Sequence, residues 1–325
     1  MTKLPYIARR FLYGIPLMLG VTFISFLLMV YFGPDKTYEL LGKNPSNEQI
    51  NEVRHSLGYD RPFLARYGDY LKELVTLDLG LSDSSGEAVS SLLARTLPVS
   101  IALVLPGFII GNVLGLALGM LAAWYRGRWL DKLVMSTSVV GMSVSFLVII
   151  IALQILLCTP YGLNIFPVRG WQVHDLSSYL YYVTVPTLAL LLVTLGYNTR
   201  FYRAVMVNEI EHDHIRTLQA YGATPVEILF KHVLKNSLIP VLTRIMFSVP
   251  FVVISGSLLL ESYFGIPGIG LVTFNAITSG DQPILKAVVG LTGVLFVLAL
   301  MLNDMLYSMV DPRVVPQLGP GANQS

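Results

Sequence analysis

The sequence predicts an all-α membrane protein with six transmembrane helices. Hydrophobic residues make up 54% of the 325 residues and charged residues only 13%, whereas charged residues form about a quarter of an ordinary soluble domain. Most of the apolar residues lie in long runs without Asp, Glu, Lys or Arg. A transmembrane helix needs about 20 such residues, so these runs are predicted to be membrane spans and a soluble protein is excluded.

The six predicted spans end at the charges or turn residues that bound the apolar runs. They are residues 11–33, 98–124, 133–158, 181–199, 238–261 and 284–309. The third run is too long for one helix, and a Pro-Tyr-Gly turn at 160–162 ends its span. The fifth run is short, so its helix starts at 238, which places Arg244 about two turns from one end, where its side chain reaches the interface. We therefore expect no charged residue at the centre of a span.

Basic residues in the short loops predict that both termini lie in the cytoplasm. Lys and Arg are concentrated before the first span, after the second and after the fourth, and cytoplasmic loops carry an excess of these residues. Residues 1–10 and 310–325 are then cytoplasmic tails, and 200–236 form a cytoplasmic loop. Residues 34–97 form an extracytoplasmic segment with short helices, because loops of this length are translocated largely regardless of charge.

The cytoplasmic loop is predicted to contain two helices separated by a glycine. Residues 209–221 contain no Gly or Pro and can be helical, and Gly222 is placed to end that helix in the left-handed conformation. Thr224 then serves as the N-cap of the second helix and Pro225 suits its first position. Glu227 stands three residues after the threonine and completes a capping box.

The second helix of this loop has an amphipathic pattern. Its apolar positions follow the helical period and are predicted to form one buried face: Val226, Leu229, Phe230, Val233 and Leu234. Glu227, Lys231 and Lys235 fall on the opposite, hydrated face. From periodicity alone, a helix that lies on the membrane surface is favoured over a docking site for another protein.

Glycines four residues apart predict a close helix contact in the second span. Gly111, Gly115 and Gly119 leave one side of that helix without side chains, so another backbone can approach, either in this chain or in a partner. No histidine lies in an uncharged span, and no Gly-x-x-x-x-Gly-Lys-Ser/Thr phosphate loop is present. We therefore predict no catalytic residue, metal ligand or cofactor, and expect any ATP to be bound by another subunit.

The cytoplasmic loop resembles a motif of known transporters. Arg216, Thr217 and Gly222 are similar to the EAA loop of permease subunits of binding-protein-dependent ABC importers, in the branch for dipeptides, oligopeptides and nickel. Leu218 departs from the small residue that is usual there. Further similar segments follow in the family's order: 6–12, 57–62, 77–82, 231–240, 264–270 and 311–313. The resemblance therefore covers nearly the whole chain.

This resemblance implies the fold of a type I importer permease in the bacterial cytoplasmic (inner) membrane. In the family the EAA loop forms a coupling helix that sits in a cleft of a cytoplasmic ATPase. Carried to this chain, the coupling residues are Arg216, Thr217, Ala220 and Gly222, supported by Thr224, Pro225 and Glu227. The implied partners are a sister permease, two ATP-binding subunits, an extracytoplasmic solute-binding protein and the lipid bilayer, with no nucleic acid and no cofactor.

An alternative interpretation is a stand-alone channel or secondary carrier whose cytoplasmic helix only rests on lipid. Internal symmetry between the two halves would favour that class, and the sequence shows no convincing repeat. Within the importer interpretation, the cargo is left open among dipeptides, longer peptides, antimicrobial peptides, glutathione-like compounds and chelated nickel.

Overall fold

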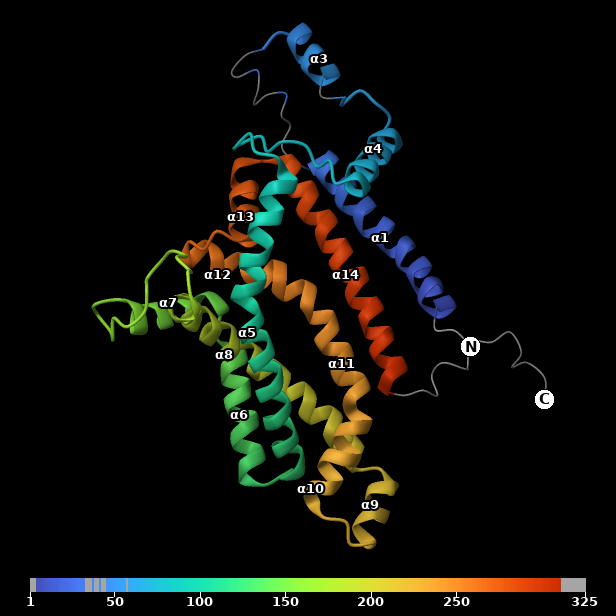
Figure 1. Ribbon diagram of the computed structural model, residues 1–325, viewed down its shortest axis with the longest axis vertical. Helices are drawn as coiled ribbons and strands as arrows, with labels where there is room; N and C mark the ends of the chain where they lie inside the picture. The colour runs from blue at the N-terminus through green and yellow to red at the C-terminus, as the bar shows by residue number, and fades with distance from the viewer. Residues whose placement is uncertain (1–3, 33–36, 38–40, 42–44, 57, 311–325) are drawn as a thin grey trace, which may run out of the picture. The chain divides into compact units, whose positions relative to one another are not determined.

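The computed structural model describes residues 4–32, 37, 41, 45–56 and 58–310. The tail 311–325, with its similar segment at 311–313, lies outside the described residues. The chain divides into two compact units: Met1–Arg95 with Val272–Val297, and Thr96–Leu271 with Leu298–Ser325. Figure 1 draws the helices of the chain, coloured by residue number. Apart from one isolated bridge between Leu81 and Ala88, every regular element in the described part is a helix.

The first unit is built around α1 (Leu4–Phe32) and α4 (Phe63–Thr76), with α3 (Asn47–Ser56) and parts of α5, α13 and α14. Aromatic rings join α1 to α4, and the Phe26 and Tyr70 rings stack with centroids 5.2 Å apart. The Tyr67 hydroxyl also donates to the Leu19 carbonyl at 2.9 Å. Aromatic side chains bury a large area at a low entropic cost, so these contacts hold α4 against α1.

A buried carboxylate holds the turn before α14 (Gln282–Val310) in the same unit. Asp281 is 1% exposed and accepts hydrogen bonds from the Ser82 hydroxyl at 2.7 Å and from the Ser84 backbone N–H at 3.0 Å. It also accepts one from the Ile284 N–H at 3.3 Å, as a helix N-cap does. The loop that follows α4 is therefore tied to the start of α14.

The second unit holds most of the helices. They are most of α5 (Val89–Trp124), α6 (Trp129–Ser143), α7 (Phe146–Cys158), α8 (Leu176–Ile210), α9 (Asp213–Ala220), α10 (Pro225–Glu227), the π-helix η1 (Ile228–Val233), α11 (Leu234–Phe251), the π-helix η2 (Val252–Gly256), α12 (Ser257–Phe264) and the first residues of α13 (Ile269–Ser279), with the end of α14. Its main core packs Ile150 of α7, Ala189 of α8 and Leu260 of α12, all fully buried.

Five helical runs are long and apolar enough to cross a membrane, and there are six if α6 and α7 count as one span with a 95° bend. The predicted span 133–158 falls on that bent pair. The predicted span 238–261 belongs to a longer run, Pro225–Phe264, which continues from the second helix of the cytoplasmic loop. The prediction of an all-α, multi-pass membrane protein is confirmed, while the orientation of the termini stays a prediction.

The glycines of α5 face α8 in this chain. A Cβ atom added at Gly115 would lie 2.8 Å from the Asn198 Cβ, and one added at Gly119 would lie 2.9 Å from the Arg203 backbone nitrogen. Gly111 faces Thr194 one turn earlier. Since real Cβ atoms almost never approach so closely, only glycine permits this helix contact.

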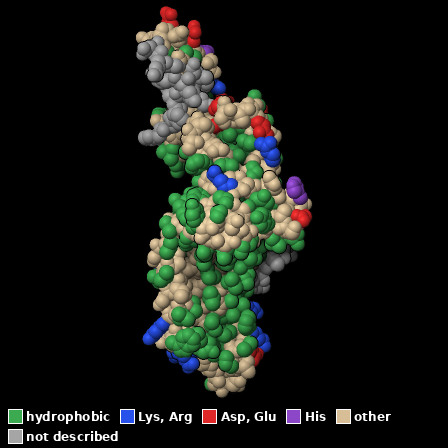
Figure 2. Space-filling model, turned by 90° about the vertical axis from the view of Figure 1, so that its left-hand side faces the viewer, with side chains coloured by type: hydrophobic (Ala, Val, Ile, Leu, Met, Phe, Trp, Pro, Cys, Tyr) green, Lys and Arg blue, Asp and Glu red, His purple; other side chains and the backbone are tan. Residues whose placement is uncertain are grey.

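Apolar side chains cover much of the visible surface of the second unit (Figure 2). Val140 of α6 and Val148 of α7 are 65% and 54% exposed. Exposed apolar surface on this scale is rare in soluble proteins, and here it lies on helices that satisfy their own backbone hydrogen bonds. The surface is therefore suited to contact lipid.

Candidate functional site

The predicted coupling residues lie on α9 and the turn after it, between the two long runs α8 and Pro225–Phe264 (Figure 1). The sequence placed one helix over 209–221, but α8 ends at Ile210 and α9 begins at Asp213. The backbone N–H of Glu211, the cap of α8, bonds to Val207 and Glu209 as that helix ends. α9 is therefore a separate helix of two turns.

Gly222 ends α9 in the predicted left-handed conformation, with φ +83°. The Gly222 N–H donates to the Gln219 carbonyl at 3.0 Å, and the Ala223 N–H donates to the Leu218 carbonyl at 3.1 Å. These two bonds form a Schellman motif, in which Ala223 and Leu218 also share one apolar cluster. The turn therefore depends on a positive φ, and a Cβ added at Gly222 would meet no atom within 4 Å.

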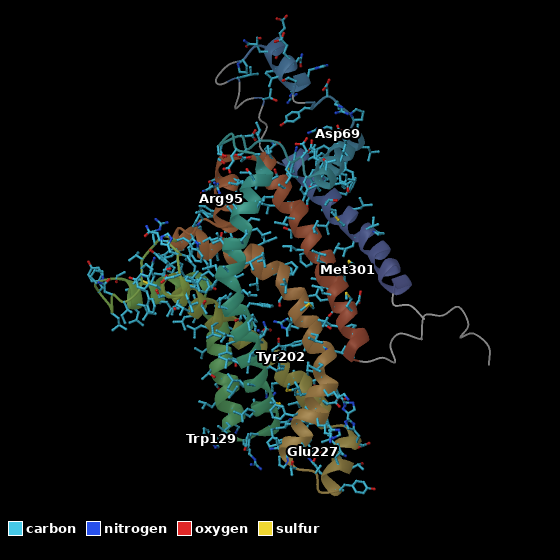
Figure 3. All side chains as sticks on the ribbon, viewed as in Figure 1. Asp69, Arg95, Trp129, Tyr202, Glu227 and Met301 are labelled. Atoms are coloured by element: carbon cyan, nitrogen blue, oxygen red, sulfur yellow. The ribbon has the colours of Figure 1, made fainter. Side chains whose placement is uncertain are left out.

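The start of the next helix differs in part from the prediction. The Thr224 hydroxyl accepts a hydrogen bond from the Glu227 N–H at 3.3 Å, and Pro225 occupies the first position of α10. The second half of the predicted capping box is wrong, because the Glu227 carboxylate pairs with Lys231 at 3.1 Å. One cap hydrogen bond and one surface ion pair thus replace the two reciprocal hydrogen bonds of a capping box. Figure 3 labels Glu227 at the end of the second unit that carries α9 and α10.

The predicted buried face of this helix is wrong in part. Val233 is buried, but Val226 and Phe230 are 66% and 55% exposed, while Ile228, outside the predicted stripe, is buried. Residues 228–233 are π-helical, and the Leu234 N–H bonds to the Leu229 carbonyl five residues earlier. In a π-helix, residues five apart share a face, so Ile228 and Val233 point inward together.

An apolar cluster fixes α9 to the helices around it. Ile215 of α9 is fully buried and packs with Met206 of α8 and with Ile228 and Val233 of η1. Ala123, near the end of α5, joins the same cluster. Because protein interiors are close-packed, a displacement of α9 must displace these helices too.

Polar contacts add a second connection between α8, α9 and α11. Glu209 of α8 accepts a hydrogen bond from Asn236 of α11 at 2.7 Å. The Glu209 carboxylate also lies 3.2 Å from the His214 ring nitrogen of α9. The sequence separations of these two residue pairs follow no helical or strand period, so the sequence did not indicate these contacts. A single carboxylate thus bridges three helices.

The loop between α5 and α6 is attached to α8 by ion pairs. Arg203 of α8 donates two hydrogen bonds, at 2.5 and 2.7 Å, to the buried carboxylate of Asp131 in the first turn of α6, and Asp131 also accepts from the Gly127 N–H at 2.8 Å. Arg126 pairs with Glu211 beyond the end of α8. Bidentate arginine–carboxylate pairs fix orientation as well as distance. The ion pairs of Arg203 and Arg126 therefore attach the segment between α5 and α6 to the end of α8.

The remaining predicted coupling residues point away from the cluster. Arg216, Thr217 and Ala220 are exposed on α9, and Tyr221 after it is 86% exposed. Arg216 makes only an exposed ion pair with Asp213 at 3.4 Å, which leaves its side chain easily rearranged. The structure therefore brings these residues together on one solvent-exposed surface, and their contact with an ATPase stays a prediction.

A cavity of about 640 Å³, widely open to the surface, lies in the second unit beside helical runs that are long and apolar enough to cross a membrane. Its lining includes Phe201 of α8, Arg244 and Phe247 of α11, and Tyr307 of α14. Arg244 was expected to extend to the interface, but its guanidinium lies over the Phe201 ring, 4.9 Å from the centroid, and its Nε is buried. Arg244 thus packs against α8, and the depth of its side chain in the membrane stays a prediction.

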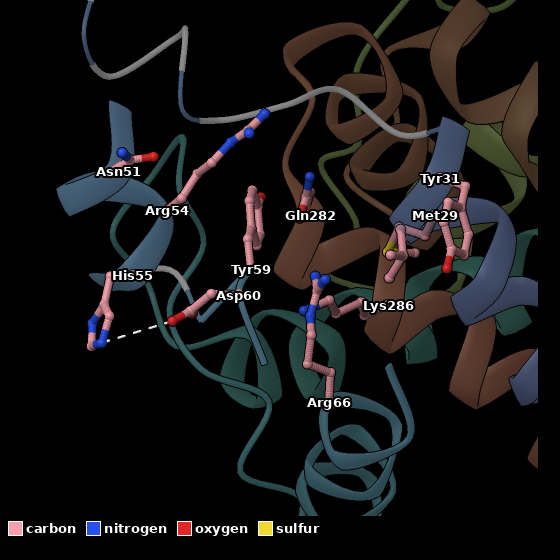
Figure 4. A pocket seen from close by; sticks show the side chains of 11 residues that line it. Met29, Tyr31, Asn51, Arg54, His55, Tyr59, Asp60, Arg66, Gln282 and Lys286 are labelled. Carbon is pink, nitrogen blue, oxygen red and sulfur yellow. Dashed lines mark ion pairs between the residues drawn. The ribbon is translucent and has the colours of Figure 1, made fainter. Parts of the chain in front are cut away.

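The first unit contains a separate pocket of about 690 Å³ (Figure 4). Arg54, Arg66 and Lys286 line it, with Asp60 as the one carboxylate among its lining residues. Arg66 lies over the Tyr59 ring at 4.9 Å. None of the predicted site residues lies in this pocket, so it belongs to a different region from the coupling surface.

Known proteins resemble this chain over nearly its full length. Residues 115–316 match the family described as binding-protein-dependent transport system inner membrane component, and residues 3–104 match the N-terminal region of such components. A putative peptide transport system permease protein of Brucella abortus is 35% identical over 95% of this chain and 98% of its own length. The dipeptide transport system permease protein DppB of Bacillus subtilis is 31% identical over 95% and 97%.

A solved structure shows the same fold. The inward-facing MetNI methionine ABC transporter contains a chain that matches this one with a TM-score of 0.55 and 19% identity, over 68% of this chain and 96% of that chain. The predicted likeness to importer permeases is confirmed, and the chain is a multi-pass protein of the bacterial inner membrane. The chain belongs to the family of binding-protein-dependent transport system inner membrane components.

Proposed function

We propose that this chain is a permease subunit of an ATP-driven importer for peptides, in which it forms half of the translocation pathway. The peptide class rests on the relatives from Brucella abortus and Bacillus subtilis, which are described as peptide and dipeptide transport permeases. A sister permease completes the pathway, two cytoplasmic subunits hydrolyse ATP and an extracytoplasmic protein delivers the solute. The chain itself performs no covalent chemistry. The stand-alone carrier gains no support, because the relatives and the structural neighbour are components of transport systems.

The observation that carries this proposal is that α9 packs on its neighbours with one side and leaves the other side exposed. Its inner side is held by the buried Ile215, and its outer side exposes Arg216, Thr217 and Ala220. A helix that only rested on lipid would need an apolar outer face, whereas Arg216 and Thr217 are polar. The surface is therefore better suited to a protein partner than to the bilayer.

The contacts of α9 also supply a route by which a movement of this helix reaches the membrane spans. α9 is connected to α8 and α11 through the Ile215 cluster and through Glu209, and both helices continue into membrane spans. When the ATP-binding subunits close, they displace α9, and the displacement moves both spans as a unit. Rigid-body and shear movements of packed helices are a general mode of such transitions.

The exposed Ala220 gives a test of the proposed ATPase contact. Ala220→Glu adds bulk and charge to the surface of α9, so the tagged complex should lose its ATP-binding subunits and its peptide uptake while the chain remains in the membrane. Ala65→Glu, at an exposed alanine of α4, is the matched control and should change neither. Normal subunit recovery and uptake in the Ala220→Glu complex would refute the assignment of this surface.

A further inference from the structure

Arg244 is the most unusual charge in the second unit. It lies near the middle of the 40-residue helical run Pro225–Phe264, and no other charged residue stands between Lys235 and Glu261. At about 1.5 Å per residue, these neighbours are about 13 and 25 Å away along the helix, so the stretch around Arg244 is long enough to span a hydrocarbon core of about 30 Å. An arginine in such a stretch is costly and is retained in membrane proteins for a function.

The surroundings of Arg244 do not neutralise it. Within the part of the chain that the structure describes, Arg244 is not among the arginines that form ion pairs, and its buried Nε has no hydrogen-bond partner. Its one strong contact is the Phe201 ring at 4.9 Å. A cation–π contact is worth about 0.5–2 kcal/mol, less than a bidentate pair with a carboxylate in such a site. The guanidinium is thus held in place but left able to bind an anion.

The cavity beside Arg244 has the size and lining of a site for a small amphipathic molecule. Its volume of about 640 Å³ falls in the usual range for small-molecule pockets. Phe247 and Phe251 supply an apolar wall, and the Thr243 and Tyr307 hydroxyls, which are hydrogen-bonded to each other, supply a polar edge. One fixed cation with an otherwise apolar wall recognises an anionic group while accepting varied side chains.

We propose that Arg244 binds the C-terminal carboxylate of the peptide cargo while the peptide crosses the membrane through this cavity. The inference rests on the proposed peptide import function. Every linear peptide carries this carboxylate whatever its side chains, and the planar guanidinium fork matches it with two parallel hydrogen bonds. The site has a single cation, so release is not opposed by further ion pairs.

The test uses the complete importer, with its sister permease, ATP-binding subunits and solute-binding protein, in proteoliposomes. The probe is a radiolabelled pool of peptides of two to five residues. Uptake is compared for the wild type, Arg244→Gln, Arg244→Lys and the control Arg95→Gln, whose side chain is exposed and pairs with Glu87. A benzophenone side chain in place of Phe247 reports peptide in the cavity by photo-crosslinking.

We expect Arg244→Gln to reduce uptake and cross-linking at position 247 by about 10- to 100-fold, the loss of one charge-assisted pair. Arg244→Lys should keep an intermediate activity and Arg95→Gln should match the wild type. Unchanged uptake in Arg244→Gln, or wild-type uptake without any cross-link at 247, would overturn the inference while leaving peptide import in place.

Two further outcomes also decide the matter. If Arg244→Gln loses its sister permease on purification, the arginine pairs with that subunit and the inference is wrong. If the wild-type importer takes up no peptide from the pool although it hydrolyses ATP, the proposed peptide function fails, and the inference fails with it.

Discussion

Glu209, near the end of α8, accepts a hydrogen bond from Asn236 of α11 at 2.7 Å, across 27 residues of chain. The two residues close the base of the loop that carries α9, and the Glu209 carboxylate also contacts His214 on α9 itself. Together with the Ile215 cluster, this contact converts a loop between two spans into a stiff connection. Stiffness is what a transmitter of movement needs, because a flexible loop would absorb the displacement.

Breaking this bridge should uncouple ATP hydrolysis from transport. In Glu209→Ala the contacts to Asn236 and His214 are lost, which costs about 1–3 kcal/mol locally. The ATP-binding subunits should still bind to α9, so ATPase activity remains while the number of peptides imported per ATP falls. Glu52→Ala, at an exposed position of α3, serves as the control. An unchanged import ratio in Glu209→Ala would show that the bridge does not contribute to coupling.

Gly222 should be replaceable only by residues that accept a positive φ. A Cβ at this position meets no neighbouring atom, so the cost of substitution comes from the backbone conformation at φ +83°. Gly222→Leu therefore destabilises the turn by about 1–2 kcal/mol and should abolish uptake with membrane insertion intact. Gly222→Asn, which tolerates the left-handed region, should keep most of the uptake. Equal uptake by both variants would argue against a conformational role for this glycine.

The contact between α5 and α8 should be sensitive to a single methyl group. A Cβ at Gly119 would lie 2.9 Å from the Arg203 backbone nitrogen and 3.1 Å from the Thr199 carbonyl oxygen, neither of which can rotate away. We expect Gly119→Ala to lower the unfolding free energy by about 1–3 kcal/mol, measured as a lower Tm of the purified protein in detergent. Gly20→Ala in α1, where no atom lies within 4 Å, should not lower the Tm. A Tm that is unchanged by Gly119→Ala would contradict the described packing.

Asp281 should stabilise its unit except in strong acid. Burial raises its pKa, but hydrogen bonds from Ser82, Ser84 and Ile284 outweigh that effect and hold the pKa below the ordinary value of 3.8. A carboxylate whose pKa is lowered by folding contributes stability above its unfolded pKa and loses it as the pH falls through the folded pKa. Asp281→Asn should therefore have a lower Tm than the wild type at pH 7 and pH 5.

The same difference in Tm should shrink only when the pH falls below about 4, since the unfolded carboxyl group titrates near that value. Ser82→Ala, which removes one donor, should show a smaller loss with the same pH dependence. If the difference between Asp281→Asn and the wild type disappeared already at pH 6, the carboxylate would not have the low pKa that its hydrogen bonds impose.

The features that could be predicted from the sequence are those set by neighbouring residues. The left-handed Gly222 and the Thr224 cap follow from local turn and cap chemistry, and the spans follow from uncharged length. The buried face of residues 226–234 could not be predicted, because helical periodicity assumes i to i−4 hydrogen bonds and this segment forms π-helical ones.

Contacts between distant segments could not be predicted from the sequence, for a different reason. The bridge from Glu209 to Asn236 and the position of Arg244 over Phe201 depend on how α8 and α11 pack. The sequence places Arg244 about two turns from the start of its helix, whereas the helical run begins at Pro225 and the guanidinium packs over Phe201. Tertiary packing decides such features, and no single segment contains that information.

The proposed contact between α9 and an ATP-binding subunit can be measured by photo-crosslinking from Ala220. A benzophenone side chain at this exposed position would be irradiated in the assembled, transporting complex, with the same probe at Ala65 as the control. This contact predicts a cross-link from position 220 to an ATP-binding subunit and none from position 65. Cross-links from position 220 only to lipid, in a complex that still imports peptide, would contradict it.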